Sequence, residues 1–197
     1  MKILIASDIH GSAKYCRMTI DAFRREGADK LVLLGDILYH GPRNPLPGEY
    51  SPKDVVEMLS EVKEKIICVR GNCDAEIDQA LLPFPLTDYA YLFVDGLDIY
   101  LSHGHRETPP MVGGVYITGH THVPLNAAEG EVYHLNPGSV SLPKEDSAHG
   151  YIVYENRRFA FKTLEGETYD GLDLGGSERP ATRTSPIVRR RIVRKRI

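Results

Sequence analysis

The sequence has few cysteines, no long apolar run and little net charge. Its three cysteines, Cys16, Cys68 and Cys73, are an odd number without paired spacing, which favours a reducing compartment over a disulfide scaffold. The apolar run at residues 1–6 is soon interrupted by Asp8, and no run approaches the ~20 apolar residues that cross a bilayer. We therefore predict a cytoplasmic protein that does not associate with membranes.

The net charge of −3 is small, but it hides two unlike regions. Residues 176–197 carry eight basic side chains and one acidic side chain, a net charge of +7, so the other 175 residues carry 16 basic and 26 acidic side chains, a net charge of −10. The composition is otherwise ordinary, with 42% hydrophobic and 26% charged residues, which excludes collagen-like and largely disordered proteins. We predict one folded domain over residues 1–175 and a basic tail over 176–197 that we expect to be flexible.

The first half of the chain alternates short apolar runs with helical spacing. Buried strands are predicted at residues 3–6, 31–34 and 66–69. Apolar residues that recur every three or four positions predict a helix over 13–23, ended by Gly27, and a second over 52–63, with Ser51 as its N-cap. This order predicts parallel strands that are joined by helices.

The second half has strand and turn signals instead. Strands are predicted over residues 91–94, 97–101, 115–117, 132–135, 151–155 and 158–164. Asp95 and Gly96 lie between the first two of these and are typical of a hairpin turn. Two sheets packed face to face, with helices outside, bury all of these strands, so we predict an α/β (α+β) fold, a two-sheet β-sandwich flanked by helices.

Side chains of metal-binding type follow the ends of five predicted strands. In chain order these motifs are Asp8-Ile9-His10, Gly35-Asp36, Gly71-Asn72-Cys73-Asp74, His103-Gly104-His105 and Gly119-His120-Thr121-His122. Ligands of α/β sheets bind beyond the carboxyl ends of the strands. Each motif alone is a weak signal, but five successive strand ends together are a strong one. Imidazole, carboxylate and amide ligands suit Mn²⁺, Fe²⁺ or Zn²⁺, and their number suits two ions that share a carboxylate.

These motifs resemble, in order and spacing, those of the calcineurin-like metallophosphoesterase superfamily. The resemblance covers roughly residues 1–165, and the segments 36–44, 70–74 and 136–141 are similar to those of small bacterial phosphodiesterases of the YfcE type. It implies the αββα fold of that superfamily for residues 1–175. It also implies a phosphoric diester hydrolase that depends on metal ions.

The resemblance further implies two ions and assigns their ligands. The first ion is held by Asp8, His10, Asp36 and His122, and the second by Asp36, Asn72, His103 and His120. In this assignment Asp36 bridges the two ions. Two such ions bind a hydroxide, lower its pKa and hold the phosphate oxygens while the hydroxide attacks. We expect two Mn²⁺ ions, with Fe²⁺, Zn²⁺ and Ni²⁺ as alternatives.

Five residues near these ligands are predicted to act in catalysis or substrate binding. We assign catalytic roles to Asp74, which would orient a ligand imidazole, and to His105, which would face the substrate or a ligand. A turn or cap and a structural histidine are the respective alternatives. Asn72, Cys73 and Arg43 are the predicted substrate-binding residues. Cys73 stands where much of the superfamily has a histidine that contacts phosphate or protonates the leaving group, which favours diesters with good leaving groups.

Two further segments lie close to the motifs. Residues 40–52 hold four prolines, and we expect them to form a stiff loop at the rim of the site, with Arg43 or Asn44 toward the substrate; a surface loop or subunit contact is the alternative. Residues 136–139 are predicted to be a tight turn without a chemical role. His134 and His149 belong to no motif and are predicted to be structural.

Three functions are compatible with these residues. A phosphodiesterase is the leading hypothesis, and a phosphomonoesterase or nucleotidase on the same ions is the alternative among enzymes. The third is a protein-interaction scaffold like the metallophosphoesterase-like retromer subunit, but such scaffolds tend to lose a ligand histidine and all seven ligand positions are filled here. The expected partners are a small phosphodiester substrate and a second copy of the chain; nucleic-acid contact by the tail is an alternative to a solvated extension.

Overall fold

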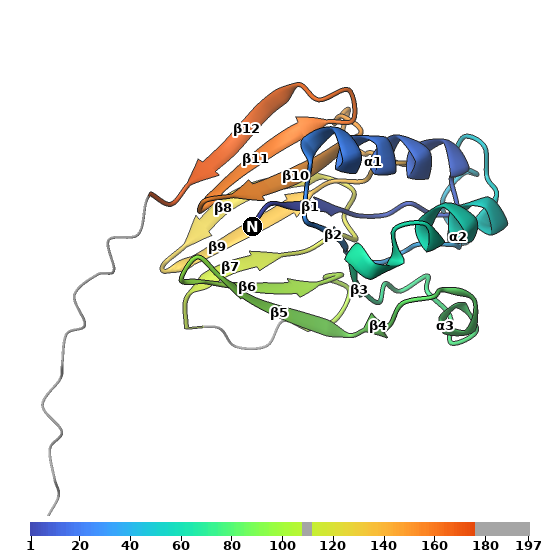
Figure 1. Ribbon diagram of the computed structural model, residues 1–197, viewed down its shortest axis with the longest axis horizontal. Helices are drawn as coiled ribbons and strands as arrows, with labels where there is room; N and C mark the ends of the chain where they lie inside the picture. Colours follow the sequence, from blue (N-terminus) through green and yellow to red (C-terminus); the bar gives the residue numbers. More distant parts are fainter. Residues whose placement is uncertain (108–111, 176–197) are drawn as a thin grey trace, which may run out of the picture.

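The chain folds into two β-sheets that pack face to face (Figure 1). This computed structural model describes residues 1–107 and 112–175, so the predicted tail over 176–197 lies outside the described residues. The seven-stranded sheet contains, in spatial order, β12 (Thr168–Asp173), β11 (Arg158–Thr163), β10 (Gly150–Glu155), β1 (Ile3–Ala6), β2 (Lys30–Leu33), β3 (Ile66–Val69) and β4 (Leu86–Thr87). The five-stranded sheet contains β5 (Tyr89–Val94), β6 (Leu97–Ser102), β7 (Gly114–Ile117), β9 (Val132–Pro137) and β8 (Pro124–Glu129). The predicted two-sheet sandwich is confirmed.

The two long helices, α1 (Ala13–Glu26) and α2 (Pro52–Ser60), lie on the outer face of the seven-stranded sheet (Figure 1). Gly27 has a φ of +61° and ends α1, because its N–H turns back to the last carbonyls of the helix. The second helix is shorter than predicted. After Ser60 the backbone bonds reach back only three residues, and a 3₁₀ turn follows at Lys63–Lys65. None of the described helices is long and apolar enough to cross a membrane.

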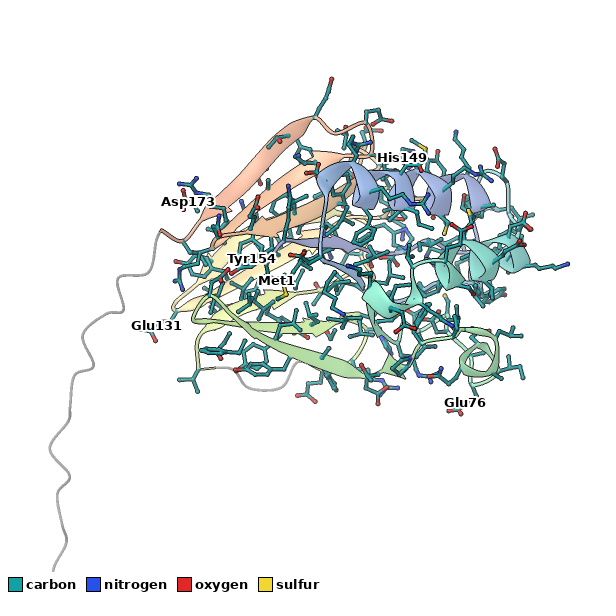
Figure 2. All side chains as sticks on the ribbon, in the orientation of Figure 1. Met1, Glu76, Glu131, His149, Tyr154 and Asp173 are labelled. Atoms are coloured by element: carbon teal, nitrogen blue, oxygen red, sulfur yellow. The ribbon has the colours of Figure 1, made fainter. Side chains whose placement is uncertain are left out.

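The core has two layers, and the seven-stranded sheet lies between them. In β1, Leu4 packs toward α1 and α2, whereas Ile3 and Ile5 pack toward the five-stranded sheet. Tyr154 of β10 also belongs to the layer between the sheets (Figure 2). Because β1 is buried on both faces, its sequence is continuously apolar, as predicted.

The outer face of the five-stranded sheet is open along β5. Tyr91 and Phe93 point outward there and are 53% and 68% exposed. The two long helices, α1 and α2, flank the sandwich on the side of the seven-stranded sheet. Four elements of the structure are not predicted from the sequence: α3 (Asp78–Leu81) and the strands β4, β8 and β12. All three strands lie at sheet edges, and β8 and β12 are mostly exposed, so they have no apolar pattern to find.

Candidate metal centre

The five motifs converge because the strands that precede them run in parallel within each sheet. β1, β2 and β3 are parallel neighbours, and so are β6 and β7. Backbone bonds then tie the strand ends together: the N–H of Asp8 donates to the carbonyl of Gly35, and the N–H of His10 donates to that of Asp36. In the second sheet the N–H of Gly119 donates to the carbonyl of His103. The motifs therefore meet at one end of the sandwich.

Five of the seven predicted metal ligands have a left-handed backbone. Their φ angles lie between +51° and +70°, in the region that residues other than glycine rarely adopt, and they are Asp8, His10, Asp36, His120 and His122. Such strain persists only where the surrounding structure imposes it, and it clusters at functional sites. All five residues lie in the loops that follow β1, β2 and β7.

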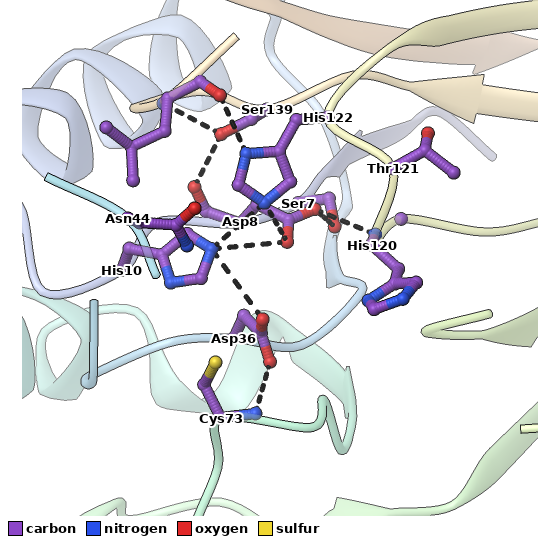
Figure 3. Close-up of polar contacts among 12 residues, drawn as sticks. Ser7, Asp8, His10, Asp36, Asn44, Cys73, His120, Thr121, His122 and Ser139 are labelled. Carbon is purple, nitrogen blue, oxygen red and sulfur yellow. Dashed lines mark hydrogen bonds and ion pairs between the residues drawn. The ribbon is translucent and has the colours of Figure 1, made fainter. Parts of the chain in front are cut away.

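Asp8, His10 and His122 form a compact, fully buried cluster (Figure 3). Asp8 Oδ1 lies 3.5 Å from His10 Nε2 and 3.2 Å from His122 Nε2. The two Nε2 atoms are 3.1 Å apart. These three atoms can each donate one lone pair to a single point between them.

Asp36 joins this cluster to a second one. Its Oδ2 atom lies 3.6 Å from His10 Nε2 and 3.4 Å from His103 Nε2. On the far side, His103 Nε2 is 3.1 Å from Asn72 Oδ1, and the ring centroids of His103 and His120 are 5.1 Å apart. The structure thus brings all seven predicted metal ligands together, with Asp36 between the two sets.

Main-chain carbonyls orient three of the imidazoles. The Nδ1 atoms of His10, His103 and His122 lie 2.8, 2.6 and 2.7 Å from the carbonyl oxygens of Tyr39, Leu34 and Leu142 respectively. A hydrogen on Nδ1 leaves the Nε2 lone pair free, and this is the usual way in which proteins prepare a histidine to bind metal.

Asp74 does not contact an imidazole among the described residues, in contrast to its predicted role. Its carboxylate instead accepts three backbone N–H groups, from Asp36 at 2.8 Å, Ile37 at 2.7 Å and Gly71 at 2.7 Å. The loop after β3 points this short side chain at the backbone after β2, where no ring nitrogen is within reach. Asp74 therefore positions Asp36 through its backbone.

The charges of the two clusters are strongly coupled. Burial raises the pKa of Asp8, but the imidazoles of His10 and His122, whose Nε2 atoms lie 3.5 and 3.2 Å from its Oδ1, outweigh this effect and hold the pKa well below its usual range. Burial lowers the pKa of His103, but the hydrogen bond with Asp36 and the charges of Asp8 and Asp36 raise it to about 9. Without an added cation, the carboxylates thus favour protonation of His10 and His103, whose pKa values are both raised. A divalent ion would compete for the same lone pairs.

Glycines allow the strand ends to approach one another this closely. A Cβ on Gly71 would collide with the carboxylate and backbone of Asp36, and a Cβ on Gly119 would collide with Ser7 Oγ. The backbone of Asp36 cannot move aside, and Ser7 Oγ is held by its hydrogen bond to Asp8 Oδ2. Gly71 and Gly119 are therefore required by packing.

One observation in particular indicates that these residues can hold divalent metal ions. Asp8 Oδ1 is completely buried, carries a negative charge and accepts no hydrogen bond from the described residues. A buried unpaired carboxylate oxygen is costly unless a cation satisfies it. Its other oxygen already accepts from Ser7 Oγ at 2.6 Å and from the His120 N–H at 3.1 Å, so Oδ1 is held toward the imidazoles.

A cavity of about 860 Å³ opens above the two clusters. Among the predicted substrate-binding residues, Asn72, Cys73 and Arg43 all line it. His105 is outside this lining; its ring centroid is 5.3 Å from that of His103, and its buried Nδ1 has no partner among the described residues. The Pro-rich loop after Asp36 forms one wall of the cavity, as predicted.

Several residues that hold the ligands in place were not found from the sequence. Ser139 and Ser141 both donate to the carbonyl of Asp8, at 2.9 and 2.8 Å, and Asn136 Nδ2 donates to the carbonyl of Gly119 at 2.8 Å. The turn at residues 136–139, together with Ser141, therefore holds in place the loops that contain Asp8 and Gly119. Lys144 lines the cavity and was not singled out either. The similarity of residues 136–141 to those of known phosphodiesterases was the one signal that pointed to the turn.

Comparison with known proteins places these features in a family. The family model described as "Calcineurin-like phosphoesterase superfamily domain" matches residues 1–158. The chain is 44% identical over 162 residues to the protein named phosphodiesterase YfcE of Escherichia coli K12, and this match covers 79% of the chain and 88% of the relative.

Solved structures agree with this match. A structure described as YfcE, a phosphoesterase from E. coli, has a TM-score of 0.85 and 41% identity; the match covers 89% of this chain and all of that one. Vps29 from Entamoeba histolytica, solved in complex with Zn²⁺, has a TM-score of 0.58 at 18% identity and covers 88% of this chain and 99% of that one. The second likeness is one of fold alone.

Proposed function

Because the chain belongs to the calcineurin-like phosphoesterase superfamily, we propose that it is a metal-dependent phosphodiesterase. The observation that carries the proposal is the position of Asp36 Oδ2, 3.6 Å from His10 Nε2 and 3.4 Å from His103 Nε2. One carboxylate oxygen between two sets of imidazoles suits a pair of ions that share a ligand. Such a pair is typical of enzymes that hydrolyse phosphate esters.

The first ion would be held by Asp8, His10, Asp36 and His122, and the second by Asp36, Asn72, His103 and His120. When bound, the two ions supply an attacking hydroxide and neutralise charge on the phosphate. The protein contributes a rigid arrangement of ligands, because Asp8 and three imidazoles are already held by hydrogen bonds. One of the two ester substituents of the substrate phosphate would lie in the cavity above the metal ligands.

Cys73 supports a preference for diesters with good leaving groups. Burial and the nearby Asp36 carboxylate raise the pKa of this thiol to about 12, so it is a poor proton donor to a departing alcohol. His105 is the remaining imidazole beside the second ligand set, and we propose that it faces the leaving group or the water around it.

The activity is tested with two aryl esters that release the same chromophore. The protein is stripped with a chelator, reloaded with Mn²⁺ and assayed with bis(4-nitrophenyl) phosphate and 4-nitrophenyl phosphate. We expect turnover of the diester, a much lower rate with the monoester, and no rate without metal. A clear preference for the monoester would identify a phosphomonoesterase, and no turnover with two ions bound would identify a scaffold.

We further propose that the ions are Mn²⁺. The ligands are oxygen and imidazole nitrogen, and they include the hard carboxylates and amide that Mn²⁺ accepts. Reconstitution with Mn²⁺, Fe²⁺, Zn²⁺ and Ni²⁺ in turn, followed by the diester assay, separates these metals. The highest kcat/KM is expected with Mn²⁺.

The cellular setting is also a proposal. Cys16 and Cys68 are buried free thiols, which supports a location in the reducing cytoplasm, and cell fractionation tests this location.

The exposed aromatic side chains along β5, Tyr89, Tyr91 and Phe93, support contact with a second copy of the chain. Light scattering of the purified protein, before and after Phe93→Asp, tests that contact. Nucleic-acid contact by the tail is tested by salt-dependent binding of an oligonucleotide.

A further inference from the structure

The cavity above the metal ligands contains more positive charge than one phosphate requires. Arg43 and Lys144 both line it and are exposed, and within residues 1–107 and 112–175 no carboxylate forms an ion pair with either. The one carboxylate in the lining is Asp36, which belongs to the metal centre. The ions themselves would neutralise the phosphate that reacts. Arg43 and Lys144 are therefore available to bind a second negatively charged group of the substrate.

Backbone contacts fix both cationic residues beside the first ligand set. The N–H of Lys144 donates to the carbonyl of His122 at 3.1 Å, and Ser147 Oγ donates to the carbonyl of Lys144 at 2.6 Å. Arg43 lies in the loop that begins at Tyr39, whose carbonyl accepts from His10. These bonds connect the segment of Lys144 to the main chain of His122 and the loop of Arg43 to the imidazole of His10.

The loop that carries Arg43 is itself well ordered by hydrogen bonds. Asn44 Nδ2 donates to the carbonyl of His40 at 2.8 Å, and the N–H of Asn44 donates to that of Gly41 at 3.4 Å. A Cβ on Gly41 would come within 3.1 Å of Cys73 Sγ, so the loop lies directly over Cys73. The loop backbone that carries Arg43 is therefore held in place beside the metal centre.

Beside the second ligand set, the nearby arginines of the described residues already have partners. Arg106 follows His105 and forms an ion pair of 2.6 Å with Asp88, and Arg70 donates to the carbonyls of Asp74 and Ala75. Within residues 1–107 and 112–175, the free positive charge of the cavity lining is therefore on the side of His10 and His122. An additional anionic group of the substrate would bind on that side, away from His105.

We propose, on the basis of the phosphodiesterase activity proposed above, that the substrate is a nucleotide-like phosphodiester with a second phosphate group held by Arg43 and Lys144. Arginine and lysine are the usual partners of phosphate, because their N–H groups form charge-assisted hydrogen bonds with its oxygens. Tyr39 also lines the cavity and is 42% exposed, so its ring offers a surface for a planar base. The volume of about 860 Å³ suits a ligand of nucleotide size.

The test uses two diesters that differ only in the second phosphate. They are thymidine 5′-(4-nitrophenyl phosphate) and the same compound with a 3′-phosphate, and both release 4-nitrophenolate. We expect kcat/KM to be roughly tenfold higher for the 3′-phosphorylated diester at low salt, and this preference to shrink as salt is added. The quantity to compare is the ratio of the two kcat/KM values for each variant.

Charge-removing variants then locate the second phosphate. Arg43→Gln and Lys144→Gln are each expected to lower the ratio severalfold, and the double variant to bring it near one. Lys53→Gln removes an exposed cation from α2, outside the cavity, and is the matched control that leaves the ratio unchanged. Melting curves verify that each variant is folded.

The outcomes separate this inference from the function on which it rests. A ratio near one in the unaltered protein, or a ratio that survives the double variant, overturns the second-phosphate site while the phosphodiesterase stands. Equal losses with both diesters, at a constant ratio, would show that Arg43 and Lys144 bind the reacting phosphate and would also overturn it. If neither these diesters nor bis(4-nitrophenyl) phosphate is hydrolysed, the phosphodiesterase proposal fails as well.

Discussion

The two predicted ion sites share Asp36 but differ in how firmly their other ligands are held. Asp8, His10 and His122 are 0%, 0% and 2% exposed, and carbonyls orient both imidazoles. In the second set, His103 is held in the same way by the carbonyl of Leu34, but Asn72 is exposed and His120 is half-buried, with no carbonyl partner for its ring among the described residues. The first predicted site is therefore the more preorganised of the two, because Asn72 and His120 of the second line the open cavity.

Removal of Asp36 would affect both sites and have the largest effect. We expect Asp36→Ala to lower kcat/KM for the diester by on the order of a thousandfold or more, since both ions lose a ligand. Metal analysis after gel filtration should find fewer than two ions per chain. Asp21→Ala, which removes an exposed carboxylate from α1, is the control and should keep both. Retention of two ions and of activity in Asp36→Ala would refute the bridge.

Histidine variants in the two sets should have unequal effects. His122→Ala removes an oriented ligand of the first site, and His120→Ala a less constrained ligand of the second. We expect His120→Ala to retain one ion per chain through gel filtration, and His122→Ala to lose the tightly held one, with apparent affinity reduced by roughly 10–100-fold. Equal losses in the two variants would remove the distinction between the sites.

Much of this centre could be predicted from the sequence, because its ligands follow strands buried on both faces. Such strands are continuously apolar, so the polar residues after Ala6 and Leu34 mark the strand ends clearly. The supports could not be predicted in the same way. Ser139 donates to Asp8, 131 positions away, and no local pattern encodes that contact.

Asp74 illustrates the same limit at short range. Its motif suggests a carboxylate near an imidazole, but the direction of the side chain depends on how the loops after β2 and β3 pack. Arg43 was identified because its loop directly follows Asp36. Lys144 was not, because only the fold brings it to the same cavity.

The pH dependence of the metal-free protein should differ from that of the loaded one. The pKa of His103 is raised to about 9 in the folded protein, above the ordinary value of 6.5. Its stabilising contribution is therefore fully present below pH 6.5 and is lost as the pH rises through 9. The Tm of the metal-free protein should fall across this window, whereas that of the Mn²⁺-loaded protein should change little. Parallel changes in the two would count against the assignment of His103 as a ligand.

The smallest expected effect concerns the residue next to Asn72. Cys73→His should raise kcat/KM for the monoester severalfold, because an imidazole can donate a proton to the leaving group or contact the phosphate. Cys73→Ser, which is similar in size to the native side chain, is the control and should not. Unchanged rates over a panel of monoesters and diesters would show that Cys73 does not limit the substrate range.

The two-ion centre is tested most directly by calorimetric titration of the metal-free protein with Mn²⁺, with diester hydrolysis followed in parallel. We expect two ions per chain, a tighter one held by the cluster of Asp8, His10 and His122 and a weaker one, with turnover appearing only as the second binds. Full activity with a single ion per chain would contradict it.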